Sequence, residues 1–395
     1  MRMTQLKTIA DIQTGPFGSQ LHKEDYVETG TPIVTVEHLG NRVFTEQNLP
    51  RVSDSDKARL IKYTLSTGDI VFSRVGSVDR CSYVDKSHDG WMFSGRCLRV
   101  RPTELVDSLY LYYYFCLEET KQFVRNIAVG ATMPSINTKL LGEVEIALPN
   151  LNNQKRIAAV LSSLDDKIEN NQKLNDNLEQ QAQSYFQELF VDNADPEWAI
   201  GTISDLGTVV GGSTPSKAKP EYYTESGIAW ITPKDLSINK SKFVSHGEND
   251  ITELGLKNSS AAIMPEGTVL FSSRAPIGYI AIAAGEVTTN QGFKSVVPKP
   301  EIGTPFVYFF LKNTLPVIEG MASGSTFKEV SGSTMKNVPA VIPDAETLAK
   351  FSDFCAPIFA QQRILEEQNQ SLATLRDNLL PKLMSGEIDV SAVQL

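Results

Sequence analysis

The sequence predicts a tandemly duplicated protein of the α/β (α+β) class, with two globular domains separated by two long, antiparallel, coiled-coil-like helices in a pseudo-two-fold arrangement. Three observations predict this fold. The phrase GDIVFSR at residues 68–74 returns as GTVLFSSR at 267–274. Two long stretches carry heptad spacing, which is typical of packed long helices. The chain has 395 residues, more than one domain of average size needs.

The repeated phrase belongs to a longer internal repeat. TIADI at residues 8–12 matches TISDL at 202–206, and the segment 130–149 aligns without a gap with 324–343. Both pairs share an offset of 194 residues. Solenoid repeats have periods of about 20–50 residues. The repeat therefore indicates duplication of a whole module.

The repeat places the boundaries of five segments. They are a first globular domain at 1–150, a long helix at 151–190, a second globular domain at 191–343, a second long helix at 344–385 and a tail at 386–395.

Short β-type runs between turn residues predict strands within both domains. These runs are DIVFSRV (69–75), CLRVRP (97–102), VEIALP (144–149), TVLFSS (268–273) and SVVPKP (295–300). Amphipathic helices are expected at 108–127 and 305–321, and Pro316 is expected to end or kink the second one.

Each long helix carries apolar residues at alternating steps of four and three. In the second helix the seam reads Phe354, Ile358, Gln361, Leu365, Gln368, Leu372, Leu375 and Leu379. In the first it reads Val160, Leu164, Lys167, Asn171, Leu174, Leu178, Gln181 and Tyr185, with apolar residues drifting to Leu161, Ile168, Ala182 and Leu189. Such seams predict antiparallel pairing of the two helices, and polar seam residues would fix its register. Two ordinary core helices are the alternative, and Pro357 fits neither interpretation because proline breaks or kinks a helix interior.

Composition limits the possible classes of function. The net charge is −10, which argues weakly against nucleic acid because phosphate neutralisation normally drives such binding. The segment 74–101 is locally basic, however. Four cysteines without CxxC spacing predict reduced thiols and no metal site. Without a signal peptide or a membrane-spanning run, we expect a cytoplasmic protein that binds no membrane.

Together these segments resemble a known family. The stretches IADIQTGPFGSQLHKEDYVETGTPIV (9–34), GDIVFSRVGSVDR (68–80), the helix at 153–190 and LRDNLLPKLMSGEIDV (375–390) are similar to the specificity subunit of type I restriction-modification enzymes. The resemblance covers essentially the whole chain, and its strength lies in these motifs together with the duplication.

The resemblance implies two target-recognition domains, each reading one half of a bipartite, asymmetric site in double-stranded DNA. The long helices would act as a ruler that sets the spacer, and would dock two methyltransferase subunits. Those subunits would methylate adenine N6, and ATP-driven motor-nuclease subunits would join them. A helix of about 35–40 residues is roughly 55 Å long, which suits two half-sites separated by a fixed gap.

The chain itself is expected to be non-catalytic. It contains no [ND]PP[FYW] motif, no glycine-rich strand–turn–helix and no GxxxxGK[ST] phosphate loop. We therefore expect no cofactor on this chain, with S-adenosylmethionine, ATP and magnesium on partner subunits. The alternative function is a two-headed scaffold that binds protein or carbohydrate.

Two glycine-rich loops at matching places are candidate DNA contacts, because glycine lets backbone amides approach phosphate. Their candidate residues are Thr14, Gly15, Gly18, Ser19, Gln20 and Lys23 in the first copy and Gly211, Gly212, Ser213, Thr214 and Lys217 in the second. A plain surface turn is the alternative for each loop.

An arginine follows each copy of the repeated phrase. Arg74 and Arg274 would end a buried strand and present a guanidinium to a base or a phosphate, unless each is paired with a nearby carboxylate. Supporting candidates are Thr35, His38, Arg80, Arg96, Lys234 and Gln291. Phe17 and Trp91 are expected in the core. The segments 130–135 and 324–329 would either bind DNA or pack each globule onto its long helix, and of these two the packing role is the one we predict.

Overall fold

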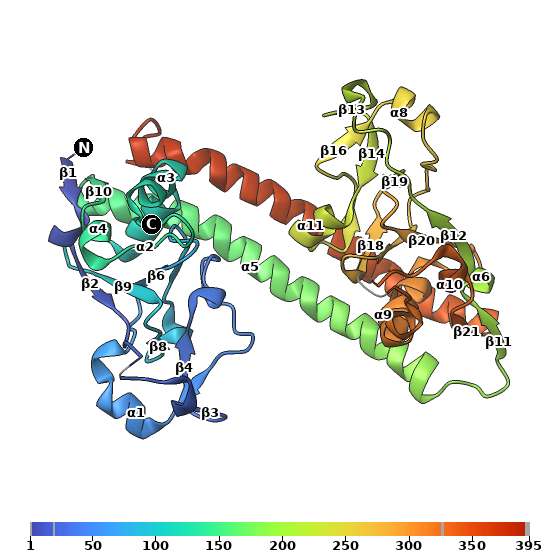
Figure 1. The fold of residues 1–395 in the computed structure, drawn as a ribbon, viewed down its shortest axis with the longest axis horizontal. Helices are drawn as coiled ribbons and strands as arrows, with labels where there is room; N and C mark the ends of the chain where they lie inside the picture. The colour runs from blue at the N-terminus through green and yellow to red at the C-terminus, as the bar shows by residue number, and fades with distance from the viewer. Residues whose placement is uncertain (1, 19, 325–327, 392–395) are drawn as a thin grey trace. The chain divides into compact units, whose positions relative to one another are not determined.

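The computed structural model describes residues 2–18, 20–324 and 328–391. Two compact units divide the chain. Unit 1 comprises Met1–Ile168 and Ser371–Leu395, and unit 2 comprises Glu169–Gln370. Both boundaries fall inside the two longest helices, α5 (Leu151–Gln187) and α11 (Ala345–Ser385) (Figure 1). Each unit therefore contains a globular part and about half of each long helix.

Unit 1 is built on two four-stranded sheets and one strand pair, with strand orders β2-β9-β6-β7, β3-β5-β4-β8 and β1-β10. The strands are β1 (Arg2–Gln5), β2 (Ala10–Thr14), β3 (Tyr26–Val27), β4 (Thr31–Val34), β5 (Arg51–Val52), β6 (Ile70–Ser73), β7 (Cys81–Tyr83), β8 (Met92–Phe93), β9 (Cys97–Pro102) and β10 (Glu145–Leu148). The helices besides the long ones are α1 (Asp54–Arg59), α2 (Ser108–Cys116), α3 (Glu118–Ile127) and α4 (Thr138–Gly142).

Unit 2 repeats this plan, with strand orders β12-β20-β17-β18-β15, β13-β16-β14-β19 and β11-β21. The strands are β11 (Ala199–Thr202), β12 (Gly207–Gly211), β13 (Tyr223–Thr224), β14 (Ile228–Ile231), β15 (Phe243–Val244), β16 (Asn249–Ile251), β17 (Val269–Ser273), β18 (Ile277–Ala283), β19 (Thr288–Thr289), β20 (Lys294–Pro298) and β21 (Pro339–Ile342). The helices are α6 (Ile203–Leu206), α7 (Pro233–Ile238), α8 (Glu253–Lys257), α9 (Thr304–Met321) and α10 (Gly332–Lys336). The predicted duplication is confirmed sheet by sheet.

The repeated phrase forms the central strand of each unit. Successive side chains of a strand point to opposite faces of the sheet. In β6, Ile70 and Phe72 enter the core shared with the long helices, whereas Val71 enters the core between the two sheets. In β17, Phe271 and Leu270 divide between two cores in the same way. Both faces are buried, so nearly every residue is apolar, and this requirement explains why the phrase recurs.

The predicted strands are confirmed, but the predicted helix at 108–127 is two helices. Leu117 adopts an extended conformation with ψ of 133° and separates α2 from α3. Helix α2 is buried on nearly all sides, from Tyr110 to Phe115. Helix α3 buries only Thr120 and Val124. One straight helix cannot satisfy both environments, so the chain turns at Leu117.

Pro316 does not end its helix and Pro357 does not break the second long helix, so these parts of the prediction are wrong. Helix α9 continues through Pro316, and α11 continues through Pro357 and Pro381 as far as Ser385, before Gly386 at φ of 80°. All three prolines are exposed. The carbonyl that each proline leaves unpaired one turn earlier can therefore bond to water, which makes an interior proline tolerable.

The antiparallel pairing of the long helices is confirmed within unit 2. The Asn171 amide donates to the side-chain oxygens of Gln368 at 3.3 Å and Asn369 at 2.9 Å, and Asn175 reaches Glu366 at 3.5 Å. Residue numbers thus rise along α5 while they fall along α11. Asn171 is 2% exposed, so this amide contact lies in the seam as predicted.

The predicted seam needs correction at every second position. Ile358 and Leu365 are buried, and Leu164, Leu178, Tyr185, Leu372 and Leu379 are half-buried, in keeping with the prediction. Phe354, Leu174 and Leu375 are 40%, 46% and 46% exposed, and Gln361 is also exposed. The inward positions on α11 are Cys355, Gln362, Asn369 and Arg376, one residue later. Several of these inward residues are polar, and the apolar spacing on which the prediction rested therefore pointed to the residues one position earlier.

Each globular part is also held to its helices by one cationic loop residue. In unit 1, Arg42 Nη1 lies 2.6 Å from Asp166 Oδ1 on α5. In unit 2, Lys242 Nζ lies 2.7 Å from Glu179 Oε2 and 2.8 Å from Gln362 Oε1, and 3.5 Å from the centre of the Phe359 ring.

The Lys242 cluster is buried, and burial shapes its titration. Burial lowers the pKa of Lys242 to about 8, although Glu179 opposes this effect. Burial alone would raise the pKa of Glu179, but Lys242 and Lys312 together lower it to about 2.

Across the described residues, no helix is long and apolar enough to cross a membrane.

Candidate nucleic-acid interface

Four loops of unit 1 meet at one edge of the sheet β2-β9-β6-β7. The end of β2 pairs with the start of β9, where Thr14 faces Leu98. The end of β6 pairs with the same strand, where Ser73 faces Cys97. The loops that leave these strand ends therefore lie side by side. They contain residues 15–18, 74–77, 94–96 and 129–135, and we call this surface the edge surface of unit 1.

Gly15 has a packing role at this edge. A Cβ atom at Gly15 would overlap the carbonyl oxygen of Ser94, so only glycine permits the close approach of the two loops. Gly18 is different, because nothing lies within 4 Å of the position that its Cβ would occupy. The glycine loop is therefore fixed at its start and open near its tip. Ser19, a further candidate in this loop, lies outside the described residues.

Arg74 is held in place by the backbone of the neighbouring loop. Its backbone N–H donates to the Arg96 carbonyl at 2.8 Å, and its Nη1 donates to the Gly95 carbonyl at 3.1 Å. The guanidinium carbon lies 5.4 Å from the centre of the Phe17 ring, a cation–π distance. Within the described part of the chain neither Arg74 nor Arg96 forms a salt bridge, and Arg96 is exposed. Two cations are thus available at this edge.

The expectation that Phe17 lies in the core is wrong. Its side chain is 54% exposed beside Arg74. Trp91 does pack into the core, against Phe44 and His88. Gly15 brings this loop into close contact with the backbone of Phe93 and Ser94, and the Phe17 ring lies outside that contact.

The segment 130–135 lies beside the arginine loop. Gly76 N donates to the Pro134 carbonyl at 2.8 Å, and Ile136 N donates to the Arg74 carbonyl at 2.9 Å. Residues 130–134 are exposed, including Met133 at 62%. Of the two expectations for this segment, the backbone contacts favour a place in the edge surface over packing against the long helix.

Unit 2 brings the corresponding loops together at its own sheet edge. Gly211 at the end of β12 pairs with Lys294 at the start of β20, and Ser273 N donates to the Gly292 carbonyl at 2.7 Å. A Cβ atom at Gly212 would overlap the Asn290 carbonyl oxygen, as at Gly15. The edge surface of unit 2 contains residues 211–214, 274–276, 290–294 and the described part of 323–329.

Arg274 has the carboxylate partner that the sequence left open. Its Nη1 lies 3.5 Å from Glu329 Oε2, and Lys294 Nζ lies 3.8 Å from Glu329 Oε1. The Thr214 hydroxyl donates to the side-chain oxygen of Gln291. The structure thus brings together six predicted residues, Gly211, Gly212, Ser213, Thr214, Arg274 and Gln291, and adds Lys294 and Glu329.

The remaining candidates differ in their availability. Lys23, Lys217 and Arg80 are exposed, although Arg80 donates to the Leu39 carbonyl. Lys234 is exposed, and its Nζ lies 2.5 Å from Glu248 Oε2. The Gln20 side chain accepts from the Tyr63 hydroxyl at 2.7 Å. Ser213 is tied down by its backbone, which donates to the Thr289 carbonyl at 2.9 Å.

His38 is a structural residue in this fold. It is 3% exposed, its Nδ1 accepts from the backbone N–H of Thr35 at 3.0 Å, and its Nε2 lies 3.1 Å from the Gln47 carbonyl. The ring stabilises the turn after β4, so we withdraw it as a DNA contact. Thr35 itself is half-buried at this turn, next to the 94–96 loop, because Ser94 N bonds to the Val34 carbonyl at 2.9 Å.

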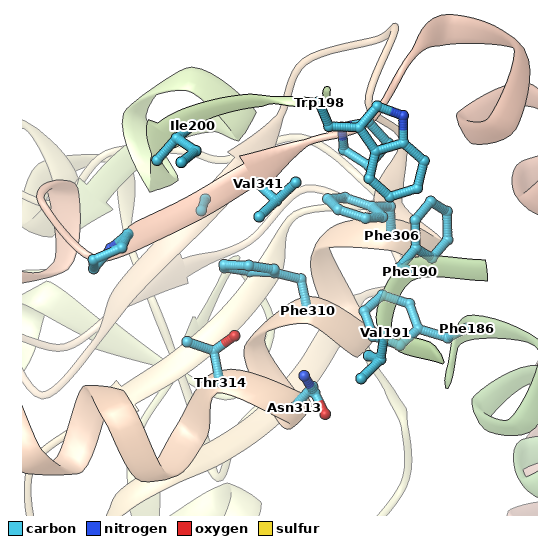
Figure 2. Close-up of a pocket in the computed structure, with 13 residues that line it drawn as sticks. Phe186, Phe190, Val191, Trp198, Ile200, Phe306, Phe310, Asn313, Thr314 and Val341 are labelled. Carbon is cyan, nitrogen blue, oxygen red and sulfur yellow. The ribbon is translucent and has the colours of Figure 1, made fainter. Parts of the chain in front are cut away.

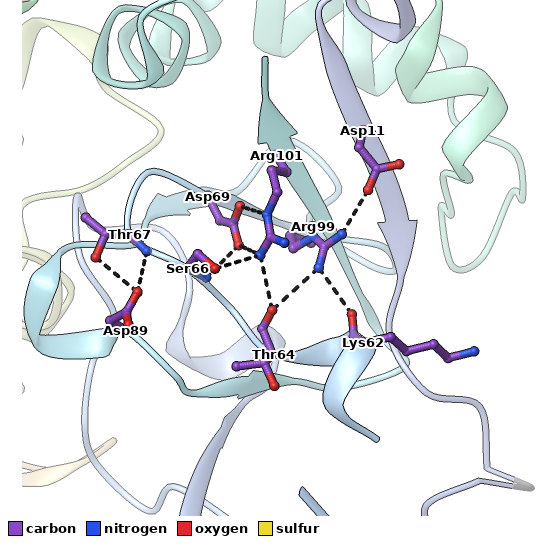
Figure 3. A network of polar contacts seen from close by, with 9 residues as sticks. All are labelled: Asp11, Lys62, Thr64, Ser66, Thr67, Asp69, Asp89, Arg99 and Arg101. Carbon is purple, nitrogen blue, oxygen red and sulfur yellow. Dashed lines mark hydrogen bonds and ion pairs between the residues drawn. The ribbon is translucent and has the colours of Figure 1, made fainter. Parts of the chain in front are cut away.

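Part of the basic segment 74–101 is used inside the fold. Arg99 Nη2 lies 2.8 Å from Asp11 Oδ2, and Arg101 binds both oxygens of buried Asp69 at 2.7 and 2.6 Å. Both guanidinium groups also donate to the Thr64 carbonyl (Figure 3). The contacts with Thr64 and Asp69 join β9 to the loop at 62–69, and the Arg99–Asp11 pair joins β9 to β2. Arg99 and Arg101 therefore stabilise unit 1 and contribute little free charge to its surface.

Comparison with known proteins places the chain in a family. The family model for the type I restriction modification DNA specificity domain matches twice, at residues 1–180 and 196–375. This chain belongs to that family. The two matches correspond to the two copies of the internal repeat.

Named relatives of this family member agree with the match. The HindI specificity subunit of Haemophilus influenzae is 23% identical over 406 residues, covering 83% of this chain and 88% of that protein. The MjaIX specificity subunit of Methanocaldococcus jannaschii is 39% identical over 191 residues, but the aligned part covers only 46% of this chain and 44% of that protein. The crystal structure of the type I S subunit from M. genitalium matches with a TM-score of 0.62 at 19% identity, covering 97% and 95% of the two chains. This structural match supports the fold.

This family member also has an apolar pocket in unit 2, of about 290 Å³. Aromatic side chains line it from the turn that follows α5 (Phe190) and from α9 (Phe306 and Phe310), together with Trp198 and Ile200 (Figure 2). Ile200 is 86% exposed. Across the described residues, no group of three or more His, Cys, Asp or Glu side chains is placed to hold a metal ion.

Four edge residues were not singled out in the sequence. Phe17 was assigned to the core, Met133 and Glu329 were named only within the segments 130–135 and 324–329, and Lys294 was not a candidate. A signal for one of them was present. The gapless alignment of 130–149 with 324–343 puts Ser135 opposite Glu329, a change from a neutral to a charged side chain next to the repeated arginine. Lys294 gave no such signal, because it lies just before the predicted strand at 295–300 and no repeated residue in the first copy marks it.

Proposed function

We propose that this chain is the sequence-specific DNA-binding subunit of a type I restriction-modification complex. Each unit reads one half of a bipartite, asymmetric site in double-stranded DNA, and the chain has no catalytic activity of its own. One observation carries the proposal: in both units a glycine-rich loop and the arginine that follows the central strand meet at the same sheet edge. The double match to the DNA specificity family supports it.

The chemistry of the two edges fits base reading. Arginine donates two parallel hydrogen bonds to guanine in the major groove, and backbone and hydroxyl groups hold phosphates. Unit 1 offers Arg74 and Arg96, whereas unit 2 offers Arg274, Gln291 and Lys294. Because these sets differ, the two half-sites should differ in sequence.

The long helices are the proposed spacer and the proposed docking surface for two adenine-N6 methyltransferase subunits. Exposed apolar residues on them, including Leu174, Phe354, Ile364 and Leu375, would be covered by such partners. S-adenosylmethionine, ATP and magnesium would be bound by the methyltransferase and motor-nuclease subunits. The partners would also supply much of the positive charge along DNA, since this chain carries a net charge of −10.

A methylome tests this function. The chain is co-expressed with the methyltransferase subunit of its own system in a host without adenine methylation, and N6-methyladenine is mapped by long-read sequencing. We expect one bipartite, asymmetric motif. Unmodified DNA, with both subunits folded and associated, would contradict the proposal and favour the two-headed protein- or carbohydrate-binding scaffold.

A further inference from the structure

Ser135 and Glu329 occupy the same structural position in the two units. In unit 1, Ser135 exchanges two backbone hydrogen bonds with Val129, at 2.8 and 2.9 Å, and the next residue bonds to the Arg74 carbonyl. In unit 2, Glu329 exchanges two backbone hydrogen bonds with Ser323, at 2.9 and 3.1 Å, and the next residue bonds to the Ser273 carbonyl. The backbone pairing of these two residues is thus shared. The accepting carbonyl belongs to the arginine in unit 1 and to the residue before Arg274 in unit 2, so the unit 2 arginine comes one position later. The side chain at the shared position is serine in unit 1 and glutamate in unit 2.

The Glu329 carboxylate keeps acceptor capacity. Its oxygens lie 3.5 Å from Arg274 Nη1 and 3.8 Å from Lys294 Nζ, which are ion-pair distances. A charge-assisted N–H···O hydrogen bond is shorter, about 2.7–2.9 Å. The side chain is 40% exposed. A carboxylate oxygen has about two lone-pair sites, so a further donor can still approach.

A carboxylate on a DNA-facing surface has a cost, because phosphates repel it. Two cations surround this one, so the cluster stays positive by one charge. Burial lowers the pKa of Lys294 and the nearby Arg274 adds to this, whereas Glu329 opposes it. The carboxylate therefore keeps two neighbouring cations together. It also places an acceptor within the same side-chain cluster as the donor fork of Arg274.

We propose that Glu329 is a specificity-determining residue of unit 2 that accepts a hydrogen bond from an exocyclic amino group of a base, cytosine N4 or adenine N6, next to the base contacted by Arg274. This inference rests on the proposed function. Acidic side chains discriminate bases in this way, since they accept from amino groups and are repelled by the O4 and O6 acceptors of thymine and guanine. Unit 1 lacks the carboxylate, so its half-site carries no such requirement at the matching position.

The test compares motifs written by the complex with its methyltransferase subunit. The variants are Glu329→Gln, Glu329→Ser, which installs the unit 1 residue, and the matched control Ser135→Ala. We expect both Glu329 variants to relax one base position in the unit 2 half of the motif, with discrimination there falling roughly 5- to 100-fold. The other half should stay unchanged. The relaxed base, cytosine or adenine, identifies which amino group is read.

A second measurement does not depend on how a variant folds. The wild-type complex is titrated with duplexes in which the relaxed base is replaced by an analogue without its amino group, 2-pyrimidinone for cytosine or purine for adenine. We expect binding to weaken about as much as in Glu329→Gln, with no further loss when both changes are combined.

Two results would overturn the inference. One is an unchanged unit 2 half-motif in both Glu329 variants, which would mean that the carboxylate only restrains charge. The other is equal wild-type affinity for duplexes with and without the amino group at each cytosine and adenine of that half. A wild-type complex that writes no bipartite motif would instead refute the proposed function.

Discussion

Units 1 and 2 fix the same loop to the long helices with different strength. The backbone contact is shared, because Tyr83 N bonds to the Arg42 carbonyl and Ile282 N bonds to the Lys242 carbonyl, both at 2.7 Å. Arg42 then reaches Asp166, which is 55% exposed. Lys242 reaches a buried cluster and is itself 6% exposed. Exposed ion pairs contribute little, and buried ones are costly to break. One duplicated scaffold therefore carries a weak clamp in unit 1 and a strong one in unit 2.

The edge surfaces of the two units also differ in how their arginines are paired. Arg74 rests on an exposed aromatic ring and carbonyl groups, without a carboxylate among the described residues. Arg274 lies beside Glu329. Duplication thus preserved the backbone at both sites and left the side chains free to diverge, which is what two different half-sites require.

The largest expected effect distinguishes the two clamps. Lys242→Ala should destabilise unit 2 by about 3–5 kcal/mol, because it leaves Glu179 and Gln362 buried with fewer partners. The matched change Arg42→Ala should cost unit 1 less, because its partner Asp166 is 55% exposed, although Arg42 itself is only 18% exposed. Urea denaturation followed by hydrogen-exchange mass spectrometry of α9 and α2 peptides reports the two units separately. Equal losses would show that the clamps are equivalent.

Acid should weaken unit 2 through Glu179. The folded pKa of about 2 lies below the ordinary value of 4.5, so the contribution is complete above pH 4.5 and is lost as the pH falls through 2. The shift corresponds to about 3 kcal/mol. In the same exchange experiment, Glu179→Gln should be less stable at pH 7 and should show a flatter stability profile between pH 4.5 and 2. Parallel profiles for the two proteins would contradict the assignment.

The two edge arginines are expected to contribute comparably to DNA affinity. Arg74→Ala and Arg274→Ala should each weaken binding of the assembled complex to its own site by about 1–3 kcal/mol. Lysine keeps the charge but loses the planar donor fork, so Arg74→Lys and Arg274→Lys should recover only part of the loss. Fluorescence anisotropy over a salt series measures the DNA affinity of the alanine and the lysine variants. Full recovery by lysine would assign the arginines to phosphates.

The smallest effect concerns the starts of helices α2 and α9. Asp107 caps α2 by accepting from the backbone of Leu109 at 3.1 Å and Tyr110 at 2.9 Å, whereas Gly303 precedes α9 without a side-chain cap. Asp107→Ala should cost about 1 kcal/mol, but Asp107→Gly, which copies unit 2, should cost only about a few tenths. Thermal unfolding of the three proteins tests this order, and an equal cost for both variants would mean that capping is not what Asp107 contributes.

The duplication, the central strands, the two long helices and the candidate glycine loops and arginines were all readable from the sequence, whereas the meeting of each loop with its arginine was not. These features are local or repeated. A strand buried on both faces must be apolar throughout. Because this strand occurs in two copies, its repeat can be recognised without knowing which residues it packs against. The gapless alignment even marked Glu329 against Ser135.

The face that each element turns toward its neighbours could be learned only from the folded structure. The inward stripe of α11 contains Gln362, Asn369 and Arg376, and hydrophobicity cannot place polar residues that find partners on α5 or in the globular parts. Arg99 and Arg101 form ion pairs inside unit 1, with Asp11 and Asp69 respectively. The folded sheet brings these partners close, although they are distant in sequence. The Phe17 ring lies outside the core, next to a loop that Gly15 brings into close contact with the Ser94 backbone. Each outcome depends on residues distant in the chain, and their spacing is set by the folded backbone.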